Sequence, residues 1–390
     1  IWDSEGEHRS LWRTDGSVAG THELPQAAYQ GNVYSVARLG DGVLFATEGP
    51  GGAPSRRVWR ADAQLAAATP VDATLNYGGP QETRAGGLAL FTCALASAPS
   101  GLCGLRASQA EPGLLAQVAG ATGMVPIDSI GDVALFLYSS GLWRSDGTAP
   151  GTYQLVQGSF YGGPRALMTT GAGSRLLFSL CRSWPASGCQ LYASDGSLAG
   201  TSVLHWTSGD EYAAIAATDG YALFALRSTY NELFATNGTA AGTTFLRSNT
   251  GVNAMASAGR YVHMTLFDGA TFQYSQVVSD GTNAGTHAVV LPPGFVVSQS
   301  ARPTSLDAGT VVFQCSSEAT GKELCAVDAD GGNARLAVDF YPGPVSGSPE
   351  LMARTAGAAY FLATDGEHGR ELWHVAVLGD PIFRAGFELP

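Results

Sequence analysis

Short apolar runs, each bounded by Gly, Asp, Asn or Pro, follow one another along the whole chain. In residues 212–246 four such runs read YAAIAAT, YALFALR, ELFAT and TTFLR, and turn residues separate them. Runs of this length between turn residues are typical of β-strands. The sequence has no amphipathic helical pattern of useful length, so the pattern predicts an all-β chain.

One segment recurs along the chain. LWRTDGSVAGTHEL (11–24) returns as LWRSDGTAPGTYQL (142–155), LYASDGSLAGTSVL (191–204), LFATNGTAAGTTFL (233–246) and VVSDGTNAGTHAVV (277–290). In each copy an Asp or Asn stands five residues before the Gly of a Gly-Thr pair. Weaker copies lie around Trp59, Leu105, Val327 and Trp373. A spacing held five times marks a structural repeat.

The repeat has a mean period of about 45 residues, the length of a four-stranded propeller blade. We name its strands A to D. The sequence therefore predicts a single β-propeller over residues 1–377, closed by N- and C-terminal strands, followed by a tail, 378–390. Because the chain begins within a strand B and stops after a strand C, either eight blades close with one terminal hairpin left over or nine close with the first and last incomplete. Known propellers mostly have four to eight blades, which favours eight. Alanine-rich A strands are expected to lie innermost.

The segments FLATDGEHGRELW (361–373) and EGEHRSLWRTDGSVAGTH (5–22) resemble the repeat of bacterial ELWxxDGT-repeat proteins. The resemblance covers nearly the whole chain and is eroded around Trp59, Leu105 and Val327. It implies a secreted or surface propeller-like protein and supplies no activity. The tail DPIFRAGFELP (380–390) is similar to a short terminal tag of some secreted bacterial proteins.

The shared residues are expected to build turns. Asp-Gly supplies a turn, since Gly accepts a positive φ and the Asp side chain binds amides two or three residues on. Calcium or sugar binding by these loops is the alternative. Asp328 and Asp330 resemble the start of a calcium-binding loop, but the later calcium ligands are missing. His205, His263 and His374 lie outside repeat positions, without metal-like spacing. We therefore predict no metal site, no cofactor and no catalytic residue.

The chain has a formal net charge of −12, and Lys322 is its only lysine. Nucleic-acid grooves and anionic membranes need clustered positive charge, so neither is an expected partner, and a neutral or cationic ligand fits the overall charge better. No apolar run of about 18 residues is present, so no membrane insertion is expected. We expect a monomer, and a processed or trimmed chain because Ile1 falls inside a strand.

The six cysteines form three local pairs, in which the first Cys follows a strand B aromatic and the second precedes the Asp-Gly position. This spacing keeps two strands of one hairpin in register. We predict the disulfides Cys93–Cys103, Cys181–Cys189 and Cys315–Cys325. Such bridges favour a secreted, cell-surface or periplasmic location. Metal-binding or redox cysteines are the alternative.

Strand direction divides the loops between two faces. The A–B turns and the C–D loops are short and uniform and are expected on one face, and the variable B–C and D–A loops on the other. On the variable face we predict aromatic platforms and nearby donors. These candidate ligand-binding residues are Tyr77, Arg84, Tyr161, Arg165, Trp184, Tyr212 and Tyr341. The alternative is that the tyrosines plug the mouth of the propeller.

These patterns favour a non-enzymatic extracellular binding or adhesion module for a glycan or a protein. The alternative is a polysaccharide lyase or glycoside hydrolase that uses the same face. It would need two converging carboxylates, or a Tyr/His pair with an Arg. The carboxylates in suitable loops are Glu82, Asp210, Glu211 and Asp339. A structural role at the cell surface is a third hypothesis.

Overall fold

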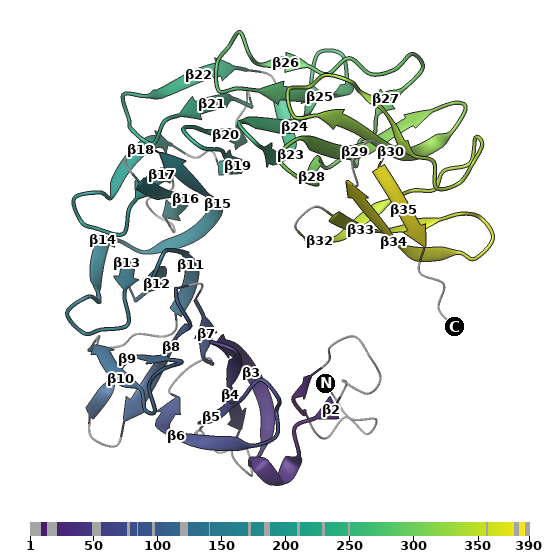
Figure 1. The fold of residues 1–390 in the computed structure, drawn as a ribbon. Coiled ribbons are helices and arrows are strands. Elements are labelled where there is room, and N and C mark those ends of the chain that lie inside the picture. The colour runs from purple at the N-terminus through teal and green to yellow at the C-terminus, as the bar shows by residue number, and fades with distance from the viewer. Residues whose placement is uncertain are drawn as a thin grey trace. The chain divides into compact units, whose positions relative to one another are not determined.

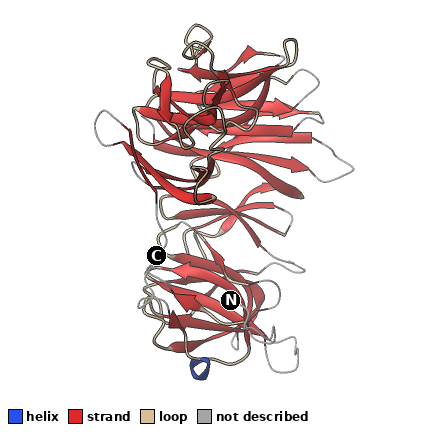
Figure 2. Ribbon diagram, turned by 90° about the vertical axis from the view of Figure 1, so that its right-hand side faces the viewer, coloured by secondary structure: helices blue, strands red, loops and turns tan. Residues whose placement is uncertain are grey.

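The computed structural model describes residues 9–13, 22–48, 56–75, 79–83, 85–95, 98–117, 124–139, 141–170, 173–182, 188–208, 211–227, 231–248, 250–355, 358–377 and 382–386. These residues form strands and turns with a single 3-10 turn, η1 (Gln26–Ala28) (Figure 2). No helix in this part of the chain is long and apolar enough to cross a membrane. The chain comprises an N-terminal unit (Ile1–Gly162, Arg182–Ala186, Ser194–Thr201) and a C-terminal unit (Gly163–Cys181, Ser187–Ala193, Ser202–Pro390).

The strands form a β-propeller of about eight blades, each an antiparallel sheet with strands in the order A–B–C–D (Figure 1). A two-stranded pair precedes them, β1 (Trp12–Arg13) and β2 (His22–Glu23). Blade 1 has β3 (Asn32–Leu39), β4 (Gly42–Glu48), β5 (Arg56–Ala61) and β6 (Ala68–Leu75); blade 2 has β7 (Gln81–Glu82), β8 (Leu88–Leu95), β9 (Ala98–Arg106) and β10 (Gly113–Ala116). Blade 3 has β11 (Met124–Ile130), β12 (Val133–Tyr138), β13 (Gly141–Ser145) and β14 (Tyr153–Gln157); blade 4 has β15 (Phe160–Thr170), β16 (Gly173–Arg182), β17 (Gly188–Ser194) and β18 (Ser202–Thr207).

Four further blades follow. Blade 5 has β19 (Glu211–Ala217), β20 (Ala222–Arg227), β21 (Leu233–Thr236) and β22 (Thr243–Arg247); blade 6 has β23 (Thr250–Ala258), β24 (Tyr261–Asp268), β25 (Gln273–Ser279) and β26 (His287–Ala288). Blade 7 has a divided strand A, β27 (Val296–Val297) and β28 (Thr304–Ser305), then β29 (Thr310–Ser317), β30 (Gly321–Asp328) and β31 (Arg335–Val338). Blade 8 has β32 (Glu350–Thr355), β33 (Ala358–Thr364), β34 (Arg370–Val377) and β35 (Ile382–Gly386).

Two details differ from the sequence-based expectation. β35 lies inside the expected tail and pairs with β34, so the last blade has a strand D where the chain was expected to stop after strand C. Blades 1 and 2 share one sheet, because the end of β6 pairs with β8. The sequence pattern missed β35 because its short run, IFRAG, lacks the Gly-Thr pair that marks strand D elsewhere.

The A strands lie innermost in the C-terminal unit, as their small residues predict. A cavity of about 460 Å³ is lined by A-strand residues of five successive blades. Ala166, Ala216, Ala256 and Thr304 are among them, and Arg354 of β32 also reaches it. Small side chains are required there because neighbouring A strands converge.

A pair of facing aromatic rings joins strands B and C. Phe224 faces Phe234 across the ladder, and the two rings stack with centroids 5.1 Å apart. Phe178 and Tyr192 stack in the same way at 5.7 Å. Fully buried Phe45 likewise faces Trp59. The repeat position held by Trp59, Tyr192 and Phe234 is therefore a cross-strand packing position within the blade.

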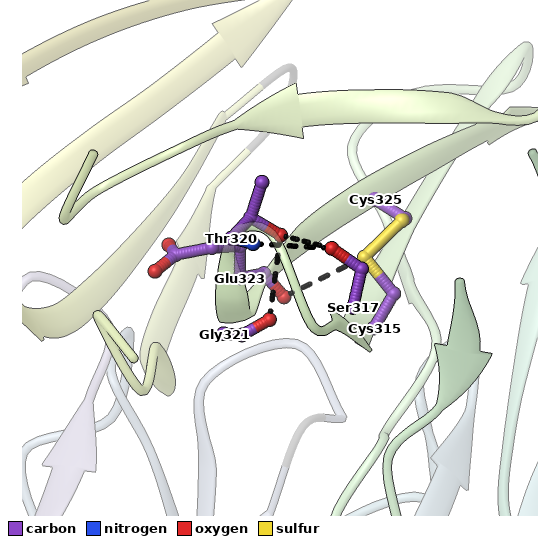
Figure 3. The surroundings of a disulfide bond; sticks show 6 residues. All are labelled: Cys315, Ser317, Thr320, Gly321, Glu323 and Cys325. Carbon is purple, nitrogen blue, oxygen red and sulfur yellow. Dashed lines mark hydrogen bonds between the residues drawn. A yellow bond between two sulfur atoms is a disulfide. The ribbon is translucent and has the colours of Figure 1, made fainter. Parts of the chain in front are cut away.

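The three expected disulfides are present, and two of them explain why the repeat is eroded. Phe91 faces Cys103 and Phe313 faces Cys325, so in blades 2 and 7 a cysteine occupies the position of the strand C aromatic. Each cysteine bonds diagonally to a Cys two residues beyond the Phe, rather than to its directly paired residue. Figure 3 shows the blade 7 bridge above a turn closed by a Ser317–Thr320 hydrogen bond of 2.8 Å.

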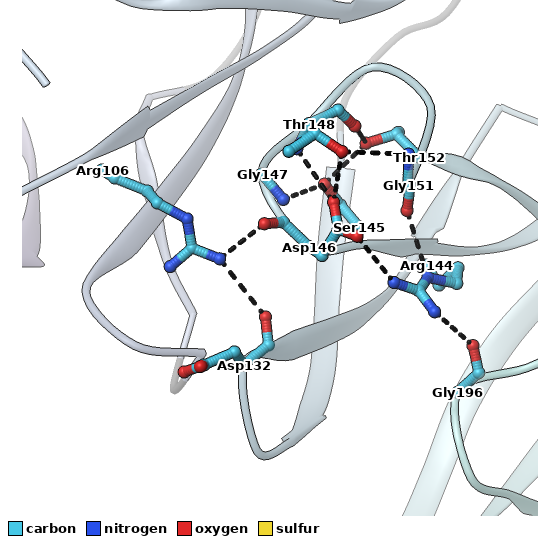
Figure 4. A network of polar contacts seen from close by, with 10 residues as sticks. All are labelled: Arg106, Asp132, Arg144, Ser145, Asp146, Gly147, Thr148, Gly151, Thr152 and Gly196. Atoms are coloured by element: carbon cyan, nitrogen blue, oxygen red, sulfur yellow. Dashed lines mark hydrogen bonds and ion pairs between the residues drawn. The ribbon is translucent and has the colours of Figure 1, made fainter.

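The C–D loop repeats one hydrogen-bond network. In blade 3 the Asp146 carboxylate accepts bonds from the Thr148 amide at 3.0 Å and from its hydroxyl at 2.7 Å (Figure 4). Thr148 Oγ1 in turn accepts a bond from the Gly151 amide. Asp195, Asn237 and Asp280 make the same contacts in blades 4, 5 and 6. The repeat residues therefore build the loop, as predicted.

Arginines join neighbouring blades at this face. Arg106 donates to the backbone carbonyls of Asp132 and Asp146, and Arg144 donates to the carbonyl of Gly196 at 3.0 Å (Figure 4). Asp132 lies in an A–B turn, whereas Asp146 and Gly196 lie in C–D loops. A–B turns and C–D loops therefore share one face in the N-terminal unit. Tyr221, in an A–B turn, shows the same in the C-terminal unit by binding the Ser279 carbonyl.

We expect Asp195→Ala to lower the free energy of unfolding by about 1 kcal/mol, because two loop hydrogen bonds are lost. Asp195→Asn should be close to neutral, since Asn237 makes the same contacts through its amide oxygen. Gly200→Ala should be more damaging than Asp195→Ala, because a Cβ there would meet the Asp195 carboxylate. Thermal unfolding of the three variants checks the order; an Asn variant as unstable as Ala would contradict it.

Non-reducing peptide mapping should find the three local bridges and no free thiol.

The double variant Cys315→Ser with Cys325→Ser should lower the free energy of unfolding by about 2–3 kcal/mol, because the constraint on a short loop is lost. Cys315→Ala/Cys325→Phe should lose less, because a ring opposite Phe313 restores the packing of the other blades. Equal losses in the two double variants would show that the position does not select for a ring.

Candidate binding site on the loop face

The structure separates the seven residues predicted from the sequence. Tyr77, Arg84 and Trp184 lie outside the described residues. Tyr161 and Arg165 are exposed on β15, with Tyr161 49% exposed. Both are accessible to a ligand, and the predicted role of Tyr161 as a platform stays a prediction.

Tyr212 belongs to the core instead of forming an exposed platform. It is 4% exposed, packs against Phe224 and has its hydroxyl 3.0 Å from Nδ1 of His205. Burial raises the pKa of its hydroxyl well above the ordinary value. Tyr212→Ala would leave a cavity in the core and is therefore expected to destabilise the fold. At the start of β19 the alternating pattern turns this ring inward.

Tyr341 is half-buried and covers a turn. Its ring lies where a Cβ on Gly366 would be, so that Gly leaves room for it. Tyr341 comes from the D–A loop of blade 7 and Gly366 from the B–C turn of blade 8. The B–C and D–A loops therefore meet on one face here, as the strand directions predict.

Next to this loop lies a cavity of about 500 Å³, a volume typical of ligand pockets. It is formed by β29, β30, the D–A loop 339–349 and the neighbouring strands of blade 8. Phe313, Leu324 and Phe361 lie almost fully buried behind the lining, whereas Leu351 is 38% exposed and is its accessible apolar side chain. Polar and charged side chains supply the rest of the lining: Ser300, Arg302, Gln314, Lys322, Ser348, Glu350, Thr364 and Arg370.

The D–A loop is held by hydrogen bonds from both blades. The Ser348 amide donates to the Lys322 carbonyl at 3.0 Å, and the Lys322 amide donates to Ser346 Oγ at 2.9 Å. From blade 8, the Thr364 amide donates to the Gly347 carbonyl at 3.0 Å. Ser348 itself has a φ of 50°, a strained conformation for a non-glycine residue. The cavity wall is thus fixed in place before any ligand arrives.

The divided strand A of blade 7 forms the opposite wall. Between β27 and β28 the chain leaves the sheet at 298–303, which brings Ser300 and Arg302 to the cavity. Ser300 Oγ donates to Oε1 of Gln314 at 2.5 Å, and Nε2 of Gln314 donates to the Pro349 carbonyl. One side-chain amide therefore ties both loops together, and its orientation is fixed by both bonds.

The charged groups of the lining are mostly basic. Arg370 pairs with Glu350 at 2.8 Å, an exposed ion pair that contributes little stability. Within the described part of the chain, the side chains of Arg302 and Lys322 have no hydrogen-bond or ion-pair partner. Three cations and one carboxylate thus line a cavity in a chain whose net charge is −12.

A buried carboxyl group lies beneath the loop. Glu323 is 0% exposed, and its two oxygens accept the amides of Phe340 at 2.8 Å and Gly347 at 2.5 Å. Burial raises the pKa of Glu323 to about 7, helped by the charge of Asp339 and opposed by the two amides. Figure 3 shows its side chain pointing away from the Cys315–Cys325 bridge. A Cβ on Gly347 would meet this carboxyl group, so Gly347 is required for the contact.

Of the four carboxylates named for an enzyme, Asp210 lies outside the described residues, Glu82 and Glu211 lie on β7 and β19, and Asp339 lies in the D–A loop near Glu323, whose pKa its charge helps to raise. Asp365, His368 and Glu371 have ligand atoms within 4.8 Å of one another. Asp365 caps its own turn by accepting the amides of Glu367 and His368, and His368 holds its pKa down to about 2. The three residues belong to the B–C turn of blade 8 and the start of β34, within the repeat segment DGEHGRELW.

Sequence reasoning missed Arg302, Lys322, Gln314 and Glu323. Lys322 had one signal, because it is the only lysine in the chain. Glu323 had another, since a Glu inside an apolar strand needs buried partners. No local pattern could place Arg302 and Lys322 in the lining of one cavity, because Arg302 reaches it only through the divided strand A.

Comparison with known proteins finds similar solved structures. They include a puromycin hydrolase mutant complexed with PGG, 17% identical over 90% of this chain and 60% of that chain, with a TM-score of 0.38. An oligogalacturonate lyase in complex with manganese is 11% identical over 76% of this chain and 88% of that chain, with a TM-score of 0.39. The β-propeller domain of the Trilobed protease from Pyrococcus furiosus is 10% identical over 91% of this chain and 98% of that chain, with a TM-score of 0.37.

The chain spans about 60% of the length of the first solved structures that it matches. No family model matches the chain, and no curated protein matches it. Similarities at these identities and TM-scores do not indicate an activity for this chain.

We expect Glu323 to make stability depend on pH. Its pKa is about 7 in the folded chain and near 4.5 when unfolded, so the folded chain holds the extra proton between these values. Its contribution is therefore complete below about pH 4.5 and is lost as pH rises through about 7, roughly 1–3 kcal/mol in all. Calorimetry at pH 5 to 8 should show a steeper fall in Tm for the wild type than for Glu323→Gln, which cannot ionise. Because both share every other titrating group, parallel slopes would contradict the assignment.

Proposed function

We propose that the chain is a non-enzymatic extracellular binding module that engages a glycan or a protein through its B–C and D–A loop face. The observation that carries the proposal is the cavity between blades 7 and 8, whose loops are fixed on both sides and whose cations keep unused hydrogen-bonding capacity. Rigid scaffolds with irregular loops are where binding residues are usually placed.

The division of labour along the chain supports a binding role. The residues shared by the blades are used within the C–D loops, as the Asp146 and Asp195 networks show. Ser300 and Arg302 line the cavity from the place where the divided strand A of blade 7 departs from the repeat. Lys322 and Arg370 occupy one and the same repeat position in blades 7 and 8, three residues before the residue that faces the strand B Phe. The site therefore combines repeat positions with a departure from the repeat.

Three disulfides in the described residues indicate an oxidising environment. We propose secretion, display at the cell surface or a periplasmic location, and membership of the ELWxxDGT-repeat proteins. The support for membership is the recurrence of the DGxxxGT segment and the GEHGRELW segment. We propose that the protein acts as a monomer.

We expect the full chain to retain glycans on a glycan array without turning them over. Leu351→Trp should weaken retention at least tenfold, because Leu351 lines the cavity, is 38% exposed and would fill the space as Trp. Leu198→Trp is the matched control, since Leu198 is 60% exposed in a C–D loop. Release of new reducing ends or unsaturated sugars from a polysaccharide panel would support the lyase or hydrolase alternative instead. Retention unaffected by Leu351→Trp would move the site elsewhere.

A further inference from the structure

We propose that the cavity between blades 7 and 8 binds an acidic glycan, one that carries a carboxylate or sulfate group. This inference rests on the proposed binding function and names its ligand class. The overall charge of −12 favours a neutral or cationic ligand for the surface as a whole. The cavity departs from that surface, because its lining holds Arg302, Lys322 and Arg370 against Glu350 alone.

The unpaired cations carry the argument. Arg370 is already neutralised by Glu350 at 2.8 Å. Arg302 and Lys322 have no side-chain partner among the residues that the structure describes, so each still has its full set of donors to offer. Two such cations directed at one cavity attract an anion and repel a cation, because their fields add inside a partly enclosed space.

The way these residues are held favours recognition over incidental charge. The backbone of Lys322 is fixed through both its amide, to Ser346, and its carbonyl, to Ser348. Arg302 lies in the 298–303 loop, which Ser300 ties to Gln314. Both cations therefore extend from backbone that is already ordered, so binding has to order the two side chains but not the backbone that carries them.

The chemistry of the two cations suits a sugar acid or sugar sulfate. The guanidinium of Arg302 can bind two oxygens of one acid group at once, whereas Lys322 acts as a point charge. Ser300, Ser348 and Thr364 line the same space and offer neutral donors for hydroxyl groups. Leu351 lines the same cavity and is 38% exposed, so it supplies an apolar surface for the C–H face of a sugar ring.

Glu323 modifies the charge beneath the cavity. It is buried under the loop and its carboxyl group faces the amides of Phe340 and Gly347, with Asp339 as a neighbouring acid. Burial raises the pKa of Glu323 to about 7, so at neutral pH this group is only partly ionised. The buried carboxyl group of Glu323 therefore opposes an anionic ligand less than an ordinary glutamate would.

The test compares matched acidic and neutral sugars on the full-length chain. The probes are trigalacturonate with its carboxyl-reduced form, and a sulfated galactotetraose with its desulfated form, so that each acidic probe carries one kind of acid group and has a neutral partner. We expect at least one acidic probe to bind tenfold or more tightly than its neutral partner, and to weaken as NaCl rises from 50 to 500 mM. The two pairs separate carboxylate from sulfate recognition.

Variants assign the effect to the cavity. Lys322→Met and Arg302→Met should each weaken the acidic probe about tenfold and change the neutral probe little, whereas Lys322→Arg should retain most of the affinity. Arg335→Met is the matched control, because it removes one positive charge from the C–D loop end of the same blade. Loss of affinity in the control equal to that in Lys322→Met would overturn the assignment to this cavity.

The single lysine provides a readout that does not depend on variants. Amine-reactive acetylation can modify only Lys322 and the chain's terminal amine. The acidic probe should slow acetylation of Lys322 severalfold in peptide mapping and leave the terminal amine unchanged as an internal control. Equal rates with and without a probe that binds would place the ligand elsewhere.

The outcomes separate this inference from the function on which it rests. If acidic and neutral probes bind equally and Leu351→Trp blocks both, the binding function stands and the acidic specificity is wrong. If no glycan of either kind is retained, or if products are released, the binding function itself fails and the ligand class fails with it.

Discussion

The hydrogen bonds that close the loop between strands C and D are the interaction on which the propeller depends. In blade 3 the Asp146 side chain holds the Thr148 amide and hydroxyl, and Thr148 holds Gly151. This network turns the chain back from strand C to strand D through hydrogen bonds between residues of the loop itself. Because these bonds are local, the same network recurs in blades 3 to 6.

The same loops then position neighbouring blades. Arg144 donates a hydrogen bond to the carbonyl of Gly151 in its own loop and another to the carbonyl of Gly196 in the next C–D loop. Tyr221 does the same with the Ser279 carbonyl in the C-terminal unit. Blade spacing on this face is thus set by short contacts to backbone, and the opposite face is left free to vary in length and chemistry.

Blade 7 shows what that freedom allows. Its strand A is divided, its strand C carries a disulfide in place of the aromatic, and the only lysine of the chain follows its B–C turn. The Cys315–Cys325 bridge holds the hairpin where a stacked ring would otherwise hold it. With the hairpin secured, Glu323 can be buried to anchor the D–A loop, and the two loops can form a cavity without weakening the blade.

The sequence by itself determined the blade. Its period, the four strands, the C–D loop and the three cysteine pairs are all local relations, set by turn chemistry and by which residues face each other across a hairpin. The candidate site depended on tertiary structure. Tyr212 is buried because a neighbouring blade covers it. Arg302 and Lys322 line one cavity because the divided strand A and the D–A loop both border that cavity. Such meetings depend on how separate segments pack, and no spacing along the chain encodes the distance between them.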